Sequence, residues 1–95
     1  MDKPEIHISK QFAKILKKNP DKIKLAFVKR LDLFIEDPTH ALVDNHPLIG
    51  NYKGYYSINI TGDYRALYSI REIGGRVVYY FELIGTHSQL YGKQK

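Results

Sequence analysis

The stretch YKGYYSINITGDYRALYSIREIGGRVVYYFELI, residues 52–84, decides the fold. Apolar and aromatic residues alternate with polar ones along it, which is the period of a β-strand. Turn-forming residues interrupt the alternation twice, at Thr61-Gly62-Asp63 and at Gly74-Gly75. The segment therefore predicts a meander of three antiparallel strands, over residues 52–60, 64–70 and 76–84.

The chain before this meander mostly has the period of helices. Residues 5–8 alternate and predict a short strand, and Ser9 is a good cap for a helix that follows. Asn19 and Pro20 are predicted to be the cap and the first residue of a second helix, which Asp37-Pro38 ends. The apolar faces of the two helices are formed by Phe12, Ile15 and Leu16, and by Ile23, Phe27, Leu31, Phe34 and Ile35.

Two helices followed by a run of strands indicate an α+β fold, with two N-terminal helices packed on a mainly antiparallel β-sheet. A length of 95 residues favours a single domain over residues 1–95. The chain has no cysteine, which excludes disulfides, thiolate metal sites and a cysteine nucleophile. No apolar run approaches the roughly 20 residues of a membrane span, so no membrane contact is expected and the cytoplasm is the expected location.

The net charge of +5 favours a polyanion or an acidic protein as partner, although a solvated surface with a slight lysine excess is the simpler alternative. The strand alternation also sorts the side chains between two faces. Tyr56, Ile58 and Ile60 share a face that should meet the helices. The opposite face should present Ser57, Asn59 and Arg65, which could line a groove.

Polar residues suited to RNA cleavage lie between two histidines, His46 and His87. Cleavage without a metal needs a base for the 2′-OH, an acid for the leaving 5′-oxygen and a cation for the phosphorane charge. Histidine suits the first two roles and arginine the third, here Arg65. The aromatic ring of Tyr91 could stack on an unpaired base.

Each of these residues also has a plain structural interpretation. His46 could be a turn residue before Pro47, and Asp63 a hairpin residue that binds its own backbone. Arg65 could form an ion pair with Glu82, and Tyr91 could be packing at the chain end. His7 and His40 are interpreted as surface residues. No two histidines have metal-ligand spacing, so neither a metal nor a cofactor is expected.

Three segments together resemble the YafQ-like toxins of the RelE/ParE superfamily. They occur in the family's order and spacing, and from residue 44 to residue 92 they span about half of the chain: residues 44–55 (DNHPLIGNYKGY), 61–68 (TGDYRALY) and 85–92 (GTHSQLYG). The resemblance implies a RelE-like, microbial-ribonuclease-like fold. It also implies a toxin of a type II toxin–antitoxin system that cleaves mRNA, typically in translating ribosomes. A cognate antitoxin, expected to be acidic, would block the toxin and contact operator DNA in the complex.

The resemblance also implies roles for particular residues. His46 and His87 would be the acid–base pair, Asp63 would orient a catalytic partner, and Tyr91 would contact the substrate. The matching positions expected to contact RNA are Arg65, at the phosphate, and Lys53, Asn59 and Tyr64.

Two positions depart from the family pattern. Asn59 stands where a histidine is common, and Tyr56 stands where an arginine is usual. Asparagine cannot relay a proton near neutral pH. We expect activity to be retained, either at a reduced rate or with reliance on His46 and His87 alone, because both histidines, Asp63 and Arg65 are present. The alternatives are an inactive toxin that acts through antitoxin binding and a ParE-type inhibitor of DNA gyrase.

Overall fold

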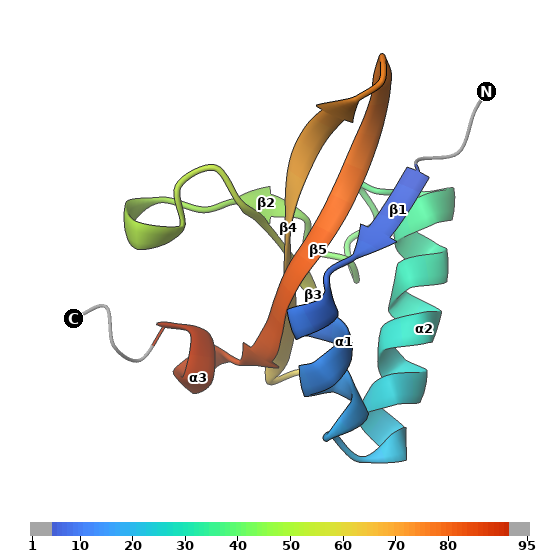
Figure 1. Cartoon of the computed structure of the whole chain (residues 1–95). Helices are drawn as coiled ribbons and strands as arrows, with labels where there is room; N and C mark the ends of the chain where they lie inside the picture. The colour runs from blue at the N-terminus through green and yellow to red at the C-terminus, as the bar shows by residue number, and fades with distance from the viewer. Residues whose placement is uncertain (1–4, 92–95) are drawn as a thin grey trace.

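The computed structural model describes residues 5–91. Within that range the chain forms two layers, which Figure 1 shows. The elements, in chain order, are β1 (Glu5–Ile8), α1 (Lys10–Lys17), α2 (Asp21–Glu36), β2 (His46–Pro47), the 3-10 turn η1 (Gly50–Tyr52), β3 (Tyr56–Asn59), β4 (Tyr64–Ile73), β5 (Arg76–Thr86) and α3 (His87–Tyr91).

The strands form one sheet in the order β1-β5-β4-β3-β2. β1 is parallel to β5, and the other neighbouring pairs are antiparallel. The predicted α+β class, the meander and its mainly antiparallel pairing are therefore confirmed. Helices α1 and α2 lie on one side of the sheet, whereas α3 and the segment around β2 lie on the other (Figure 1).

An aromatic core holds the helices on the sheet. Phe12 of α1 and Phe27 of α2 both contact Phe81 of β5, with ring centroids 6.0 Å apart in each case. Phe34 lies 5.3 Å from Tyr68 and 6.0 Å from Phe81. All five side chains are buried, so removing one ring would leave a large cavity and cost about 3–5 kcal/mol of stability.

The helix boundaries agree with the sequence except at one cap. The Ser9 hydroxyl accepts a hydrogen bond from the Phe12 amide at 2.9 Å, as predicted. The cap of α2, however, is Pro20 and not Asn19, because Pro20 is extended, with ψ of 153°. The side-chain amide of Asn19 instead turns back and donates to the Ile15 carbonyl at 2.9 Å, which satisfies a carbonyl group at the end of α1.

The first meander strand is shorter than predicted, since β3 begins only at Tyr56. Residues 50–55 coil instead of extending, because Gly50 and Gly54 have positive φ of 69° and 98°. Between the predicted second helix and the predicted meander, His46–Pro47 form a further strand, β2, in which His46 pairs with Ser57 of β3.

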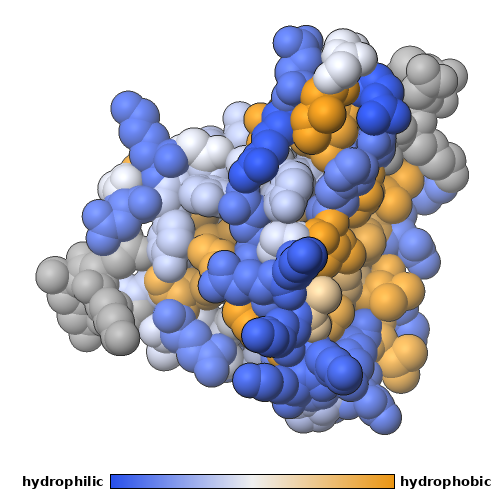
Figure 2. All heavy atoms as spheres, viewed as in Figure 1, coloured by the Kyte–Doolittle hydropathy of each residue, from blue (hydrophilic) through white to orange (hydrophobic). Residues whose placement is uncertain are grey.

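The other two meander strands are longer than predicted, because β4 ends at Ile73 and β5 at Thr86. At the end of this hairpin Ile73 and Val77 are exposed, and Figure 2 shows apolar atoms there among hydrophilic ones. None of the helices described is both long and apolar enough to cross a bilayer.

Tyr68 makes the stability of the fold sensitive to alkaline pH. Its ring is buried and its hydroxyl donates to Asn45 Oδ1 at 2.8 Å. Burial raises the pKa of Tyr68 to about 12 from its ordinary value of 10.0, although the Asn45 contact acts in the opposite direction. The unfolded chain therefore loses this proton first, so the stability present below pH 10 falls as the pH rises from 10 towards 12.

We expect this loss to reach about 3 kcal/mol, the free energy that corresponds to two pH units. Tyr68→Phe should remove the difference, and Tyr80→Phe, which keeps the Tyr68 hydroxyl, should retain it. The measurement is the free energy of urea unfolding of each variant at pH 9 to 11.5. An equal slope with pH in the two variants would contradict the assignment to Tyr68.

Candidate active site

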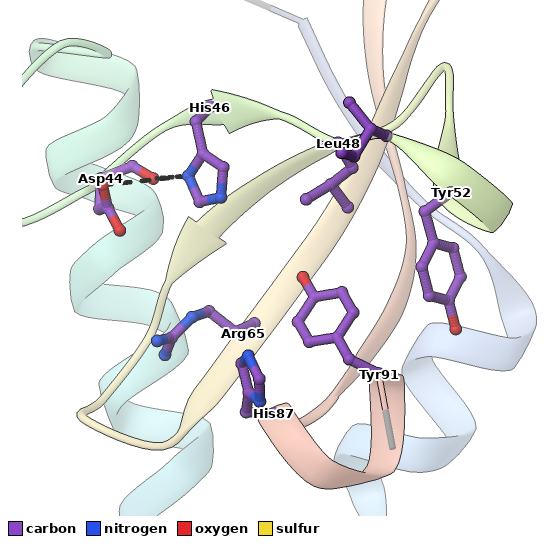
Figure 3. Close-up of a pocket in the computed structure, with 8 residues that line it drawn as sticks. Asp44, His46, Leu48, Tyr52, Arg65, His87 and Tyr91 are labelled. Carbon is purple, nitrogen blue, oxygen red and sulfur yellow. Dashed lines mark hydrogen bonds and ion pairs between the residues drawn. The ribbon is translucent and has the colours of Figure 1, made fainter. Parts of the chain in front are cut away.

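The main cavity lies on the face of the sheet opposite α1 and α2. Its volume is about 460 Å³, within the range of about 300–1,000 Å³ typical of ligand sites. Side chains from β2, η1, β4 and α3 converge on it, as Figure 3 shows. The lining residues are Asp44, His46, Leu48, Ile49, Tyr52, Arg65, His87 and Tyr91.

His46 has one ring nitrogen engaged by its own loop. Its Nδ1 lies 2.7 Å from the Asp44 carbonyl oxygen and 3.9 Å from the Asp44 carboxylate (Figure 3). A carbonyl oxygen can only accept, so Nδ1 must carry the proton of the neutral ring. Nε2 is then the unprotonated nitrogen, which is the state of a general base.

The loop that carries His46 is held by both layers of the fold. The main-chain amide of Asn59 donates to the Val43 carbonyl at 2.8 Å, and the Val43 side chain is buried. From α2, Arg30 donates to the Asn59 carbonyl at 3.1 Å and also to the Leu42 carbonyl. The helical layer therefore fixes the approach of the loop to Asp44, whose φ of +50° turns the chain into β2.

His87 is the first residue of α3, a helix that the strand pattern did not predict. Thr86 and Gln89 form a reciprocal cap: the Gln89 amide donates to Thr86 Oγ1 at 3.1 Å, and the Thr86 amide donates to Gln89 Oε1 at 2.8 Å. A side chain at Gly85 would come within 3.0 Å of Gln89, so glycine allows this close approach. The helix brings His87 and Tyr91 together, with ring centroids 4.7 Å apart.

Arg65 is the cation of the cavity and is half-buried. Its guanidinium donates to Asn59 Oδ1 at 2.5 Å and to the Thr61 carbonyl at 3.4 Å. The alternative ion pair with Glu82 is wrong, because Glu82 instead binds Arg71 at 2.9 Å. Arg65 is therefore held by neutral oxygens and keeps its full positive charge beside the two histidines.

The structure brings together four of the predicted site residues, namely His46, Arg65, His87 and Tyr91. The other four do not line the cavity. Asp63 is exposed, and the contact that links it to the site is through its main chain, since its carbonyl accepts from the His87 amide at 3.0 Å. The Tyr64 hydroxyl donates to Asn19 at 2.9 Å, and Lys53 is exposed next to η1.

Two residues of the predicted groove do not line the cavity. Asn59 is half-buried and binds Arg65, as described above. Ser57 is fully buried, and its Oγ has no hydrogen-bond partner within residues 5–91. Ser57 therefore does not present its hydroxyl to solvent as the alternation predicts.

Half of the cavity lining was not predicted: Asp44, Leu48, Ile49 and Tyr52. Leu48, Ile49 and Tyr52 lie where the chain coils around Gly50, a conformation without a period to recognise. The signal available for Asp44 and Tyr52 was their place in the segment 44–55 that resembles the toxin family. No group of three His, Asp or Glu side chains within the described range could hold a metal ion.

Comparison with known proteins gives a consistent family. The family model described as the ParE toxin of the type II toxin–antitoxin system parDE matches residues 6–91. The mRNA interferase toxin YafQ of Escherichia coli K12 is 30% identical over 92 residues, which cover 93% of this chain and 96% of YafQ. The chain therefore belongs to the RelE/ParE superfamily of type II toxins, and within it to the YafQ-like toxins.

Solved structures agree with this assignment. The crystal structure of YafQ from E. coli BL21(DE3) has a TM-score of 0.66 at 28% identity and covers 94% of this chain and 99% of that one. The E. coli DinJ-YafQ toxin–antitoxin complex has a TM-score of 0.71 at 25% identity and covers 96% and 100% of the two chains.

Proposed function

We propose that this toxin is a metal-independent endoribonuclease that cleaves mRNA in translating ribosomes. The observation that carries the proposal is the meeting of His46, His87 and Arg65 in one cavity. Two imidazoles and one guanidinium supply the base, the acid and the phosphate ligand that cleavage of an RNA backbone needs.

The proposed reaction assigns one step to each of these three side chains. His46 Nε2 takes the proton of the 2′-OH, and the 2′-oxygen attacks the adjacent phosphorus. The bond from phosphorus to the 5′-oxygen breaks, and His87 gives its proton to that oxygen. The products are a 2′,3′-cyclic phosphate and a 5′-hydroxyl. Arg65 stabilises the charge that develops on the phosphorane oxygens.

The two departures from the family pattern leave these three groups in place. Asn59 supports catalysis by holding Arg65 and takes no part in proton transfer. Tyr56 stacks on Tyr68, with ring centroids 5.3 Å apart, and supplies no charge near the phosphate. Activity is therefore retained, with one cation fewer than is usual in the family.

The proposed protein partner is an acidic antitoxin, and the proposed location is the cytoplasm. Through this antitoxin the toxin–antitoxin complex contacts operator DNA. The E. coli relative has been crystallised with DinJ in a toxin–antitoxin complex. On this chain a net charge of +5 favours an acidic segment, and α1 alone contributes Lys10, Lys14 and Lys17. Figure 2 shows hydrophilic residues over much of the side where α1 lies.

Induction of the wild-type chain and of His87→Ala, with primer extension on a reporter mRNA, tests the nuclease. We expect new 5′ ends within the message for the wild type and none for His87→Ala, because the leaving oxygen then lacks its acid. Growth arrest with intact mRNA would contradict the proposal, and a gyrase supercoiling assay would then test the ParE-type alternative.

A further inference from the structure

The cavity has two chemically different halves. Asp44, His46, Arg65 and His87 form the polar half, and Leu48, Ile49, Tyr52 and Tyr91 form the apolar half. We propose that the apolar half binds one unpaired nucleobase next to the scissile phosphate, with Tyr52 as the residue that stacks on it. The inference rests on the proposed nuclease function and names the residue that positions its substrate.

The position of Tyr52 relative to the reacting groups supports this subsite. In Figure 3 the ring of Tyr91 stands between His87 and Tyr52. Tyr91 is edge-on to both, with ring centroids 4.7 Å from His87 and 5.8 Å from Tyr52. A nucleotide whose phosphate lies at Arg65 and His87 therefore has its base directed along Tyr91 towards Tyr52.

Tyr52 is held in place before any ligand binds. Its carbonyl accepts from the Tyr55 amide at 3.0 Å, and the Tyr55 carbonyl accepts from the Leu48 amide at 2.9 Å. The Tyr55 ring is also perpendicular to Tyr52, with centroids 6.2 Å apart. A preformed ring loses little conformational freedom when a base stacks on it, which favours binding.

Ile49 provides the second observation. It is 87% exposed, the largest value among the exposed large apolar residues of the described range, and it lines the cavity beside half-buried Leu48. Leu48 and Ile49 therefore offer apolar surface that a bound base would cover. Burial of that surface stabilises the bound state by the hydrophobic effect.

The chemistry of this half also limits the kind of recognition. Its four lining side chains carry no charge and no amide, and its hydroxyls are those of Tyr52 and Tyr91. Stacking tolerates every base because each has a π-face. The subsite therefore requires that a base be present and unpaired, and it discriminates weakly between bases.

If Tyr52 stacks on a base, removal of the Tyr52 ring and removal of that base from the RNA should weaken binding to the same extent, which gives a direct test. The probe is a short single-stranded RNA of mixed sequence with fluorescein at one end and a 2′-deoxy sugar at the cleaved position. Abasic residues are placed at each neighbouring position in turn. Binding of each RNA to the wild type, Tyr52→Ala, Tyr52→Phe and Ile49→Ser is followed by fluorescence anisotropy.

We expect Tyr52→Ala to weaken binding of the complete RNA by about 5- to 150-fold, the range found for loss of one base stack. The same variant should bind the RNA that is abasic at one particular position as tightly as the wild type does. Tyr52→Phe should bind nearly normally, and Ile49→Ser should weaken binding to a lesser extent. Tyr80→Ala, which removes a half-buried tyrosine outside the cavity, is the matched control.

Additive losses, in which Tyr52→Ala weakens the abasic RNAs as much as the complete one, would overturn the base subsite. Loss of folding in Tyr52→Ala would show in its thermal unfolding, and Ile49→Ser, at an exposed position, would then decide. A wild type that cuts mRNA in a His87-dependent way, with no effect of Tyr52, would refute the subsite alone. Intact mRNA would instead refute the nuclease function.

Discussion

His46→Ala and His87→Ala should each lower the rate of RNA cleavage by about 10²- to 10⁴-fold, the usual contribution of a general base or acid. In the proposed reaction, His46 removes the 2′-OH proton through the Nε2 that its contact with Asp44 leaves unprotonated. His87 is proposed to supply the proton for the 5′-oxygen. The two losses should not multiply in the double variant, because the residues act as a unit on one reaction.

The pH dependence distinguishes the two roles. A general base acts in its unprotonated form and a general acid in its protonated form, so the two roles give opposite dependences of the cleavage rate on pH. The wild type should therefore give a bell-shaped profile of kcat/KM. His46→Ala should lose the rise on the acidic side, and His87→Ala the fall on the alkaline side.

His7→Ala is the matched control for these variants. His7 is exposed on β1 and pairs with Glu5 at 2.8 Å, outside the cavity. It should leave the rate and both limbs of the profile unchanged. Loss of the same limb in His46→Ala and His87→Ala, or a wild-type profile that is flat with pH, would contradict the assignment of base and acid.

The sequence was sufficient for the parts of the fold that have a period. The stripe from Ile23 to Ile35 predicted α2, and the alternation after Tyr56 predicted the central strands. A segment of two or three residues is too short to show a period, so β2 and η1 were not predicted. It also gave no partner for residues 5–8, whose parallel pairing with β5 depends on how α1 and α2 return the chain to the sheet.

The sequence predicted half of the residues that line the cavity. His46, Arg65, His87 and Tyr91 were identified from their chemistry and from the family resemblance, and all four line the cavity. The orienting role of Asp63 stays a prediction, since its hydrogen bond with His87 runs between main-chain atoms and no side-chain pattern reveals it. The Thr86–Gln89 spacing is a capping box and could have predicted α3.

The contact between Asn59 and Arg65 explains why the altered family position need not abolish activity. Asn59 pairs with Arg65 across β3 and β4, so the two side chains emerge side by side on the cavity face. The amide oxygen fixes the guanidinium without neutralising it. A carboxylate at the same place would form an ion pair that competes with the substrate phosphate.

Arg65→Lys should therefore lower the cleavage rate by about 10²- to 10³-fold, the effect of removing one donor that stabilises transition-state charge. Lysine keeps the positive charge but loses the planar fork that binds Asn59 and two phosphate oxygens together. The loss should fall on kcat more than on KM, because the phosphorane carries more charge than the bound phosphate. Single-turnover cleavage of a short RNA measures both parameters.

Two further variants separate the charge of Arg65 from its position. Asn59→Ala keeps the Arg65 guanidinium but removes the side-chain oxygen that holds it, so the cleavage rate should fall less than in Arg65→Lys. The cleavage rate should fall further in Asn59→Asp than in Asn59→Ala, since the new carboxylate competes with the phosphate for the guanidinium. Arg71→Lys, on the Glu82 pair outside the cavity, should cut like the wild type. Equal rates for Asn59→Ala and Asn59→Asp would show that Arg65 does not act through its charge at the phosphate.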